Sequence, residues 1–547
     1  MGQSLEKSLA GKYKKKEEVV LEGKNLAELP PSIGNLQKCI KLLVNNNDLT
    51  ELPPEIGNIQ TLKLLDASNN RINFVPPQIT GLKNLTELYL SNNKLFVQGV
   101  PDCIGDLVGL KKLFISTNQL EEVPTTLGNL TNLSHLYLEG NKLKTVPPQY
   151  GKLTKLTHLS VRNNEIYVLP PEIGQLQNLE YLDLGENILS LLPPTIGKLK
   201  QIKYFDIGHN RVSQLPVEMA ELELLEEFII SYNAEIKELP SLAYLRNVKK
   251  LSMAGLTIDH FPPDLQYLTA LTELNISSNH QVGHLPFEIG FLEKLVKLDI
   301  HDNGLKELPK EIGKLSNLKH LDIQNNSLSS ELLPYEFGNL IGLEILKLRT
   351  NILTTLPCEI KNMIIVRELD LSMNNLIQLP DEIGDMISLE KLVVEGNKLS
   401  TFPAEIGRLT DLTELNAKSN ELNLLPPEIG DLFMCTTMDF SHNMLVELPW
   451  EMGSRFFFFC IFYFPYLFFS LPYLGALPNL QVLNLRHNPL ILPPKPIVNQ
   501  GTPAILQWLR LNEYKVSFLL FLLLDSIPLP LLQAHSMLIF FIPAQKS

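Results

Sequence analysis

The chain has 547 residues, of which 44% are hydrophobic and 20% are charged, a composition typical of a folded protein rather than a disordered one. Its 60 acidic residues outnumber its 47 basic residues and give a formal net charge of −13. We expect no nucleic-acid partner, because phosphate backbones are bound by clustered Lys and Arg. The 5 cysteines are widely spaced, which fits neither a disulfide framework nor a zinc site and favours a reducing compartment.

Residues 1–18 form a basic, polar segment that lacks the apolar core of a secretory signal. Gly2 follows the initiator methionine and precedes a run of lysines, so Gly2 is a candidate site of lipidation. The usual N-myristoylation pattern has Ser or Thr at residue 6, where this chain has Glu6. An acyl chain beside a basic run would give peripheral contact with a membrane, and a solvated charged tail is the alternative interpretation.

Residues 19–490 repeat one template. The segment LPPEIGNIQTLKLLDASNNRI returns as LPPEIGQLQNLEYLDLGENIL and, with variation, as about twenty copies of LPxxIGxLxxLxxLxLxxNxL. Its asparagine recurs mostly every 23 residues, as at Asn47, Asn70 and Asn93. A period of 20–29 residues with this leucine pattern is typical of leucine-rich repeats. The sequence therefore predicts an α/β leucine-rich-repeat solenoid, curved, with a parallel sheet on its concave face.

Each template position has a physical role. The alternating leucines of LxxLxL point inward from a short strand, and the residues between them face solvent. One repeat cannot bury its leucines alone, so neighbouring repeats stack into a continuous core. The asparagine amide can tie backbone groups of adjacent coils together. The prolines of LPP suit a segment that leaves the sheet, because proline has no backbone N–H.

Two apolar segments, 454–475 and 516–547, interrupt this pattern. The asparagine step from Asn443 to Asn488 is 45 residues, and removing the 22 residues of 454–475 restores a step of 23. Three interpretations stay open: membrane association, an apolar surface for a partner, and translated introns retained in a gene model. Internal prolines argue against a membrane-spanning helix in either segment. We favour retained introns.

Residues 491–515 are expected to form a C-terminal cap, which a solenoid needs to close its core. Thr502 precedes Pro503 and an apolar helical run, and we therefore expect Thr502 to be the N-cap of a helix. Residues 515–518, Lys-Val-Ser-Phe, resemble a short docking motif for a protein phosphatase catalytic subunit.

The solvent-facing strand positions are the best candidates for function. Twenty strands about 4.8 Å apart would make a face on the order of 95 Å long, which suits a protein partner better than a small molecule. Aromatic residues and arginine are common anchors of protein interfaces. The candidate partner-binding residues are Tyr89, Phe114, Tyr137, Arg162, Tyr181, Asp183, Tyr204, Asp206, His209, Tyr232, Asp299, His301, Asp322 and Arg349. A solvated sheet face with β-favoured aromatics is the alternative.

No local motif of a kinase, a P-loop nucleotide-binding protein, a zinc protease or a serine hydrolase occurs in the chain. We therefore expect no enzymatic activity, no cofactor and no metal site. The template resembles the Ras-group intracellular leucine-rich-repeat proteins of animals and plants over residues 19–515. The resemblance implies a non-enzymatic scaffold in small-GTPase or related signalling, whose partners include a small GTPase or a protein phosphatase catalytic subunit. We expect a monomer in the cytoplasm, with membrane association as an open alternative. The alternative is a membrane-associated, receptor-like sensor anchored by the C-terminal apolar segments.

Overall fold

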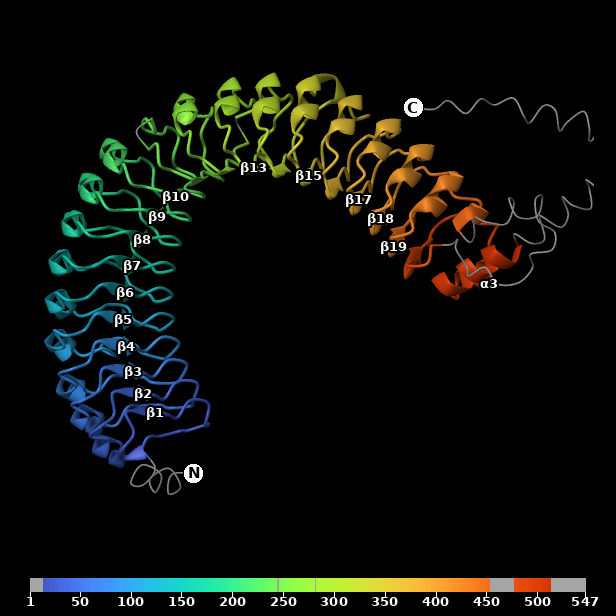
Figure 1. The fold of residues 1–547 in the computed structure, drawn as a ribbon. Coiled ribbons are helices and arrows are strands. Elements are labelled where there is room, and N and C mark those ends of the chain that lie inside the picture. Colours follow the sequence, from blue (N-terminus) through green and yellow to red (C-terminus); the bar gives the residue numbers. More distant parts are fainter. Residues whose placement is uncertain (1–12, 244, 281, 453–476, 513–547) are drawn as a thin grey trace, which may run out of the picture. The chain divides into compact units, whose positions relative to one another are not determined.

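The structure is a computed structural model that describes residues 13–452 and 477–512, except residues 244 and 281. The chain divides into two compact units, Met1–Leu305 and Lys306–Ser547. Each unit is a series of coils in which a three-residue strand is followed by an extended turn and usually by a short 3-10 helix. In unit 1, the strands line the inner side of a curve and the 3-10 helices lie on its outer side (Figure 1).

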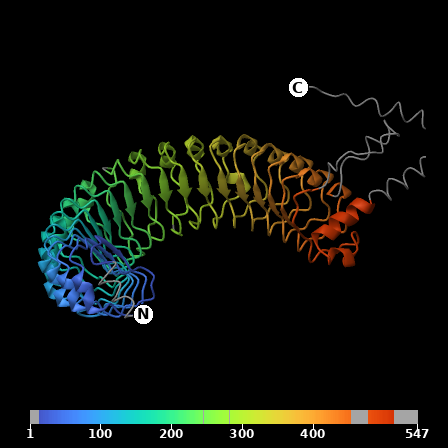
Figure 2. The same cartoon turned by 60° about the horizontal axis from the view of Figure 1, so that its bottom comes forward.

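Strands of each unit lie side by side as a parallel ladder (Figure 2). Unit 1 contains β1 (Glu18–Val20), β2 (Lys41–Leu43), β3 (Leu64–Asp66), β4 (Glu87–Tyr89), β5 (Lys112–Phe114), β6 (His135–Tyr137), β7 (His158–Ser160), β8 (Tyr181–Asp183), β9 (Tyr204–Asp206), β10 (Glu227–Ile229), β11 (Lys250–Ser252), β12 (Glu273–Asn275) and β13 (Lys297–Asp299). Unit 2 contains β14 (His320–Asp322), β15 (Ile345–Lys347), β16 (Glu368–Asp370), β17 (Lys391–Val393), β18 (Glu414–Asn416), β19 (Thr437–Asp439) and β20 (Val482–Asn484). Equivalent template positions pair with each other, so that each side chain on the sheet lies beside its counterparts in the neighbouring coils.

The 3-10 helices follow the prolines of the template. Those of unit 1 are η2 (Pro31–Asn35), η3 (Pro54–Asn58), η4 (Pro77–Gly81), η5 (Asp102–Asp106), η6 (Thr125–Asn129), η7 (Pro148–Lys152), η8 (Pro171–Gln175), η9 (Pro194–Lys198), η10 (Val217–Glu221), η11 (Pro263–Tyr267) and η12 (Phe287–Phe291). Those of unit 2 are η13 (Lys310–Lys314), η14 (Ser330–Leu332), η15 (Tyr335–Asn339), η16 (Cys358–Asn362), η17 (Asp381–Asp385), η18 (Ala404–Arg408), η19 (Pro427–Asp431) and η20 (Trp450–Met452). The template glycine lets these turns pack closely: a Cβ on Gly57 would lie 2.0 Å from the backbone oxygen of Gln78 in the next coil.

The template asparagines tie neighbouring coils together, as predicted. Asn187, which is 6% exposed, accepts a hydrogen bond from the backbone N–H of Ile166 at 3.0 Å. Its amide donates to the backbone oxygens of Val161 and Leu184 at 3.0 Å and of Gly185 at 3.1 Å. The strand leucines, including Leu159 and Leu182, are fully buried between the coils. The predicted solenoid with a parallel sheet is confirmed.

The coil ladder of unit 2 continues across residues 453–476, which lie outside the described residues. Strand β19 pairs directly with β20. The backbone N–H of Leu477 donates to the oxygen of Met452 at 3.5 Å. Other coils make the same hydrogen bond between residues three apart. For example, the backbone N–H of Leu222 donates to the oxygen of Met219 at 3.1 Å. The described residues on either side therefore complete a coil of the usual geometry.

The C-terminal end of unit 2 is covered by α3 (Lys495–Val498) and by a helix that includes residues 502–512. Thr502 is the first residue of this helix, and the N–H of Ile505 donates to the oxygen of Gly501, which is therefore the N-cap. The prediction of Thr502 as N-cap is wrong by one residue. Its hydroxyl instead accepts a hydrogen bond of 2.8 Å from the backbone N–H of Leu483 in β20, which ties the helix to the last strand.

Candidate functional site

The first and third residues of each strand form one surface of the sheet, which we call the strand face. The middle residue points into the core: Leu136 in β6 is fully buried, while His135 and Tyr137 on either side of it are half-buried. This alternation follows from the pleat of a strand. The parallel register then places first residues beside first residues and third beside third, and so it converts a periodic sequence into rows of side chains.

Large aromatic side chains occupy the third row over β4, β5 and β6. The rings of Tyr89 and Phe114 stack at 4.8 Å between centroids and 19° between planes, and those of Phe114 and Tyr137 at 4.6 Å and 8°. Stacked aromatic pairs add about 0.5–1.5 kcal/mol to the contribution of their buried area. Burial, reinforced by a hydrogen bond to Glu87, raises the pKa of Tyr89, so this tyrosine stays neutral at physiological pH.

A second aromatic row occupies the first positions of β6 to β9. His135 stacks on His158 at 4.4 Å, His158 on Tyr181 at 5.7 Å, and Tyr181 on Tyr204 at 4.3 Å. Burial lowers the pKa of both histidines. The neighbouring charges of His158 and Lys112 lower the pKa of His135 further, whereas Glu180 opposes the shift at His158. The two rows meet in β6. We call their seven side chains the aromatic surface: Tyr89, Phe114, Tyr137, His135, His158, Tyr181 and Tyr204.

Charged groups border the aromatic surface over β8 and β9. Arg162 lies 2.8 Å from a carboxylate oxygen of Asp206, 2.6 Å from one of Glu186 and 3.8 Å from one of Asp183. The side chains of Asp183 and Asp206 are only 7% and 4% exposed. Burial raises the pKa of Asp183 to about 6, and the hydrogen bond from Gly185 opposes this shift. We call these four side chains the Arg162 cluster.

One carboxylate oxygen of each aspartate in this cluster has a structural role. Oδ1 of Asp183 accepts a hydrogen bond from the backbone N–H of Gly185 at 2.9 Å, and Oδ1 of Asp206 accepts one from Gly208 at 2.7 Å. The same turn recurs far from the cluster, for example at Asp370 in unit 2. These aspartates were predicted to have only a partner-binding role. The recurrence of Asp or Asn at the third strand position in many copies indicates the structural role as well.

His209 and Tyr232 lie beside the strand face rather than on it. Their rings stack at 4.3 Å, and Tyr232 is 46% exposed. Both residues have positive φ angles, 54° and 57°, as does Glu186 at 52°. Most other coils also have a left-handed residue at this position, which Gly and Asn adopt at the lowest cost. Residues other than Gly and Asn also take this position elsewhere, for example Thr117, Thr350 and Met373, so the left-handed residue is a property of the repeat rather than of this surface.

The four predicted partner-binding residues from Asp299 to Arg349 belong to two different units. In unit 1, Nδ1 of His301 lies 2.6 Å from a carboxylate oxygen of Asp299. In unit 2, Oδ1 of Asp322 accepts a hydrogen bond from the N–H of Gln324, and Arg349 donates to the hydroxyl of Ser372 at 2.9 Å. Twelve of the fourteen predicted residues thus lie in unit 1 and two in unit 2, and stacking and ion-pair contacts join several of those from Tyr89 to Tyr232.

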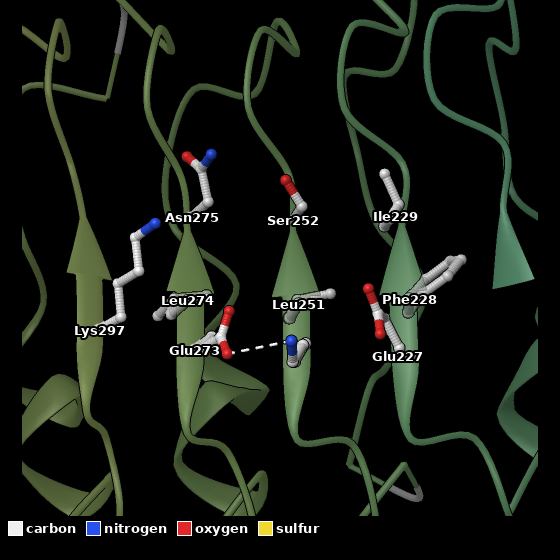
Figure 3. A pocket seen from close by; sticks show the side chains of 10 residues that line it. Glu227, Phe228, Ile229, Leu251, Ser252, Glu273, Leu274, Asn275 and Lys297 are labelled. Carbon is white, nitrogen blue, oxygen red and sulfur yellow. Dashed lines mark ion pairs between the residues drawn. The ribbon is translucent and has the colours of Figure 1, made fainter. Parts of the chain in front are cut away.

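A hollow over β10 to β13 was not predicted from the sequence. The short side chains of Ser252 and Asn275 follow Ile229 in the third row, and the charged side chains of the first row, such as Glu227 and Glu273, line the other end of the same strands (Figure 3). Lys250 and Glu273 pair across the hollow at 3.1 Å. The signal was present in the sequence, because the first row changes from aromatic to charged residues after β9, and the third row has no large aromatic residue after β6.

Four further predictions concern residues outside the described part of the chain: Gly2, the segments 454–475 and 516–547, and the docking motif at 515–518. Among the helices that the structure describes, none is both long enough and apolar enough to cross a membrane.

The comparisons with known proteins agree with this architecture. A family model described as a leucine-rich repeat region matches residues 32–142, 98–187, 149–249 and 259–356, and a leucine-rich repeat model matches residues 479–499. The chain belongs to the leucine-rich repeat family. Leucine-rich repeat domains are commonly protein-interaction modules, and these proteins are generally non-enzymatic binding scaffolds. A search of curated proteins gave no match.

Several solved leucine-rich repeat structures are similar to this one. A leucine-rich repeat protein of Leptospira interrogans is 31% identical, with a TM-score of 0.51, and the match covers 80% of this chain and 92% of that one. YopM from Yersinia enterocolitica is 26% identical, with a TM-score of 0.62, over 89% of this chain and 90% of that one. The plant peptide hormone receptor RGFR1, solved in complex with RGF2, is 27% identical, with a TM-score of 0.65, over 80% and 76% of the two chains.

Proposed function

We propose that this leucine-rich repeat protein is a scaffold that binds a signalling protein on the strand face of unit 1, over β4 to β10. The observation that carries the proposal is the aromatic surface, whose stacked rings lie half-buried on an open sheet beside the Arg162 cluster. Rings held in place by their neighbours lose little conformational freedom on binding, which favours affinity. The receptor RGFR1 in complex with RGF2 supports a peptide-binding role for this fold.

We extend the proposal to a cytoplasmic scaffold of a small-GTPase-type pathway, which rests on the resemblance of the repeat template to Ras-group proteins. The supporting feature is the LPxxIG form of the repeat. A protein phosphatase catalytic subunit is a further partner implied by the same resemblance.

The test is a binding assay with small GTPases loaded with GTP or with GDP, using the full chain as bait. We expect selective binding of the GTP form, reduced at least about tenfold by Tyr181→Ala, because interface aromatics are frequent hot spots. Tyr167→Ala is the matched control, because Tyr167 is 53% exposed and lies outside the strands. Equal failure with both nucleotide states, with a folded protein, would remove the small-GTPase assignment. Equal loss in the two variants would remove the strand face as the binding surface.

A further inference from the structure

Beside Tyr137, two polar atoms lack hydrogen-bond partners. Oε2 of Glu139 and Oγ of Ser116 are both buried and have no partner among the residues that the structure describes. Glu139 and Ser116 occupy the same template position in adjacent coils, and Ser116 is 7% exposed. A buried carboxylate oxygen without a donor is costly, and folded proteins rarely leave one in that state.

Unit 2 contains the same local sequence with its charge satisfied. Glu395, like Glu139, precedes Gly and the template Asn and is half-buried. Its carboxylate lies 3.0 Å from Nζ of Lys418, which occupies the same template position in the next coil. The chain itself therefore fills this position with a cation in one place.

In unit 1, the equivalent cation is directed elsewhere. Arg162 takes the place of Lys418 in the coil after Glu139, but its guanidinium pairs with Asp206, Glu186 and Asp183. Among the described residues, no ion pair to Glu139 is formed. Three carboxylates thus share one guanidinium, and the unpaired carboxylate of Glu139 interacts electrostatically with one of them, Asp183.

We propose that Glu139 binds a cationic side chain supplied by the partner, and that this side chain is an arginine. The proposal rests on the proposed function, because it names the chemistry that the strand face recognises. A guanidinium offers five N–H donors in a planar fork, which suits the two oxygens of the Glu139 carboxylate. It also stacks on aromatic rings, and Tyr137 lies two residues before Glu139 on the same side of the strand. A change of side-chain rotamer at Glu139 brings Oε2, which is buried in the free protein, to the ligand.

The probe is a fluorescein-labelled peptide of alternating Gly and Arg, eight residues long, titrated with the full chain and followed by fluorescence anisotropy. Matched peptides carry Lys, or the neutral arginine analogue citrulline, in place of Arg. We expect the Arg peptide to bind at least about tenfold more tightly than the citrulline peptide and more tightly than the Lys peptide, because charge-assisted bidentate hydrogen bonds are the strongest ones.

The protein variants are Glu139→Gln and its matched control Glu395→Gln, which removes the same charge from the same template position. We expect Glu139→Gln to weaken the Arg peptide about tenfold and Glu395→Gln to change it less than twofold. Equal effects of the two variants, or equal affinity for Arg and citrulline peptides, would overturn the proposal. Failure of the proposed function gives a different result, namely partner binding that is insensitive to Tyr181→Ala.

Discussion

The asparagine ladder makes a quantitative prediction at Asn187. Replacement by Ala removes four hydrogen bonds. The oxygens of Val161, Leu184 and Gly185 each keep another donor, but the buried N–H of Ile166 is left without an acceptor. An orphaned buried donor costs about 1–3 kcal/mol, and each of the three weakened carbonyl contacts adds roughly 0.5 kcal/mol. We therefore expect Asn187→Ala to destabilise the protein by about 2.5–4.5 kcal/mol.

The assay is urea-induced unfolding followed by circular dichroism, with hydrogen exchange of the peptide that contains Ile166 as a local measure. Asn178→Ala is the control within the same coil, because Asn178 is exposed and makes one hydrogen bond, to the oxygen of Thr154 at 2.7 Å. We expect the control to cost less than about 1 kcal/mol. Equal destabilisation by the two variants, or unchanged exchange at Ile166 in Asn187→Ala, would refute the role of the ladder.

Three further predictions follow from the cap, the buried carboxylate and the interrupted coil. Thr502→Val should lower the free energy of unfolding by about 1–2 kcal/mol, because it leaves the N–H of Leu483 without an acceptor. Hydrogen exchange should rise around β20 only, and unchanged exchange there would contradict this. Asp183→Asn should stabilise the protein at pH 8 by on the order of 2 kcal/mol and have little effect at pH 4. The reason is that burial raises the pKa of Asp183 to about 6 in the folded protein, so wild-type stability falls as pH rises through 6. Thermal melts that give the same difference at both pH values would exclude this. Deletion of residues 454–475 should leave the melting temperature unchanged or higher, because Leu477 already closes the coil, and loss of cooperative unfolding would show that the segment is needed.

The fold followed from sequence because every copy of the template repeats the same physical solution. Periodic leucines fixed which side chains point inward, and the asparagine period fixed the register. The candidate site was only partly predictable. Alternation identified Tyr137 and Tyr181 as outward-facing, and parallel register made their stacking foreseeable.

Contacts that depend on side-chain direction were not foreseeable from the template. Arg162 turns toward Asp206, two coils away, and so leaves Glu139 unpaired. The chain does the opposite at Glu395, with nearly the same local sequence. Thr502 was expected to cap its own helix, but its hydroxyl binds the last strand, because an exposed sheet edge offers an unpaired N–H at that point.

The most direct test of the strand face as the binding surface is site-specific photo-crosslinking in the full chain. A photoreactive phenylalanine analogue is placed at Phe114, at Tyr181 or at the control position Tyr167, and the protein is irradiated with a GTP-loaded small GTPase. We predict a crosslinked complex from Phe114 and Tyr181 and none from Tyr167. Crosslinking from Tyr167 with none from the strand positions would contradict the assignment of the partner-binding surface to the strand face of unit 1.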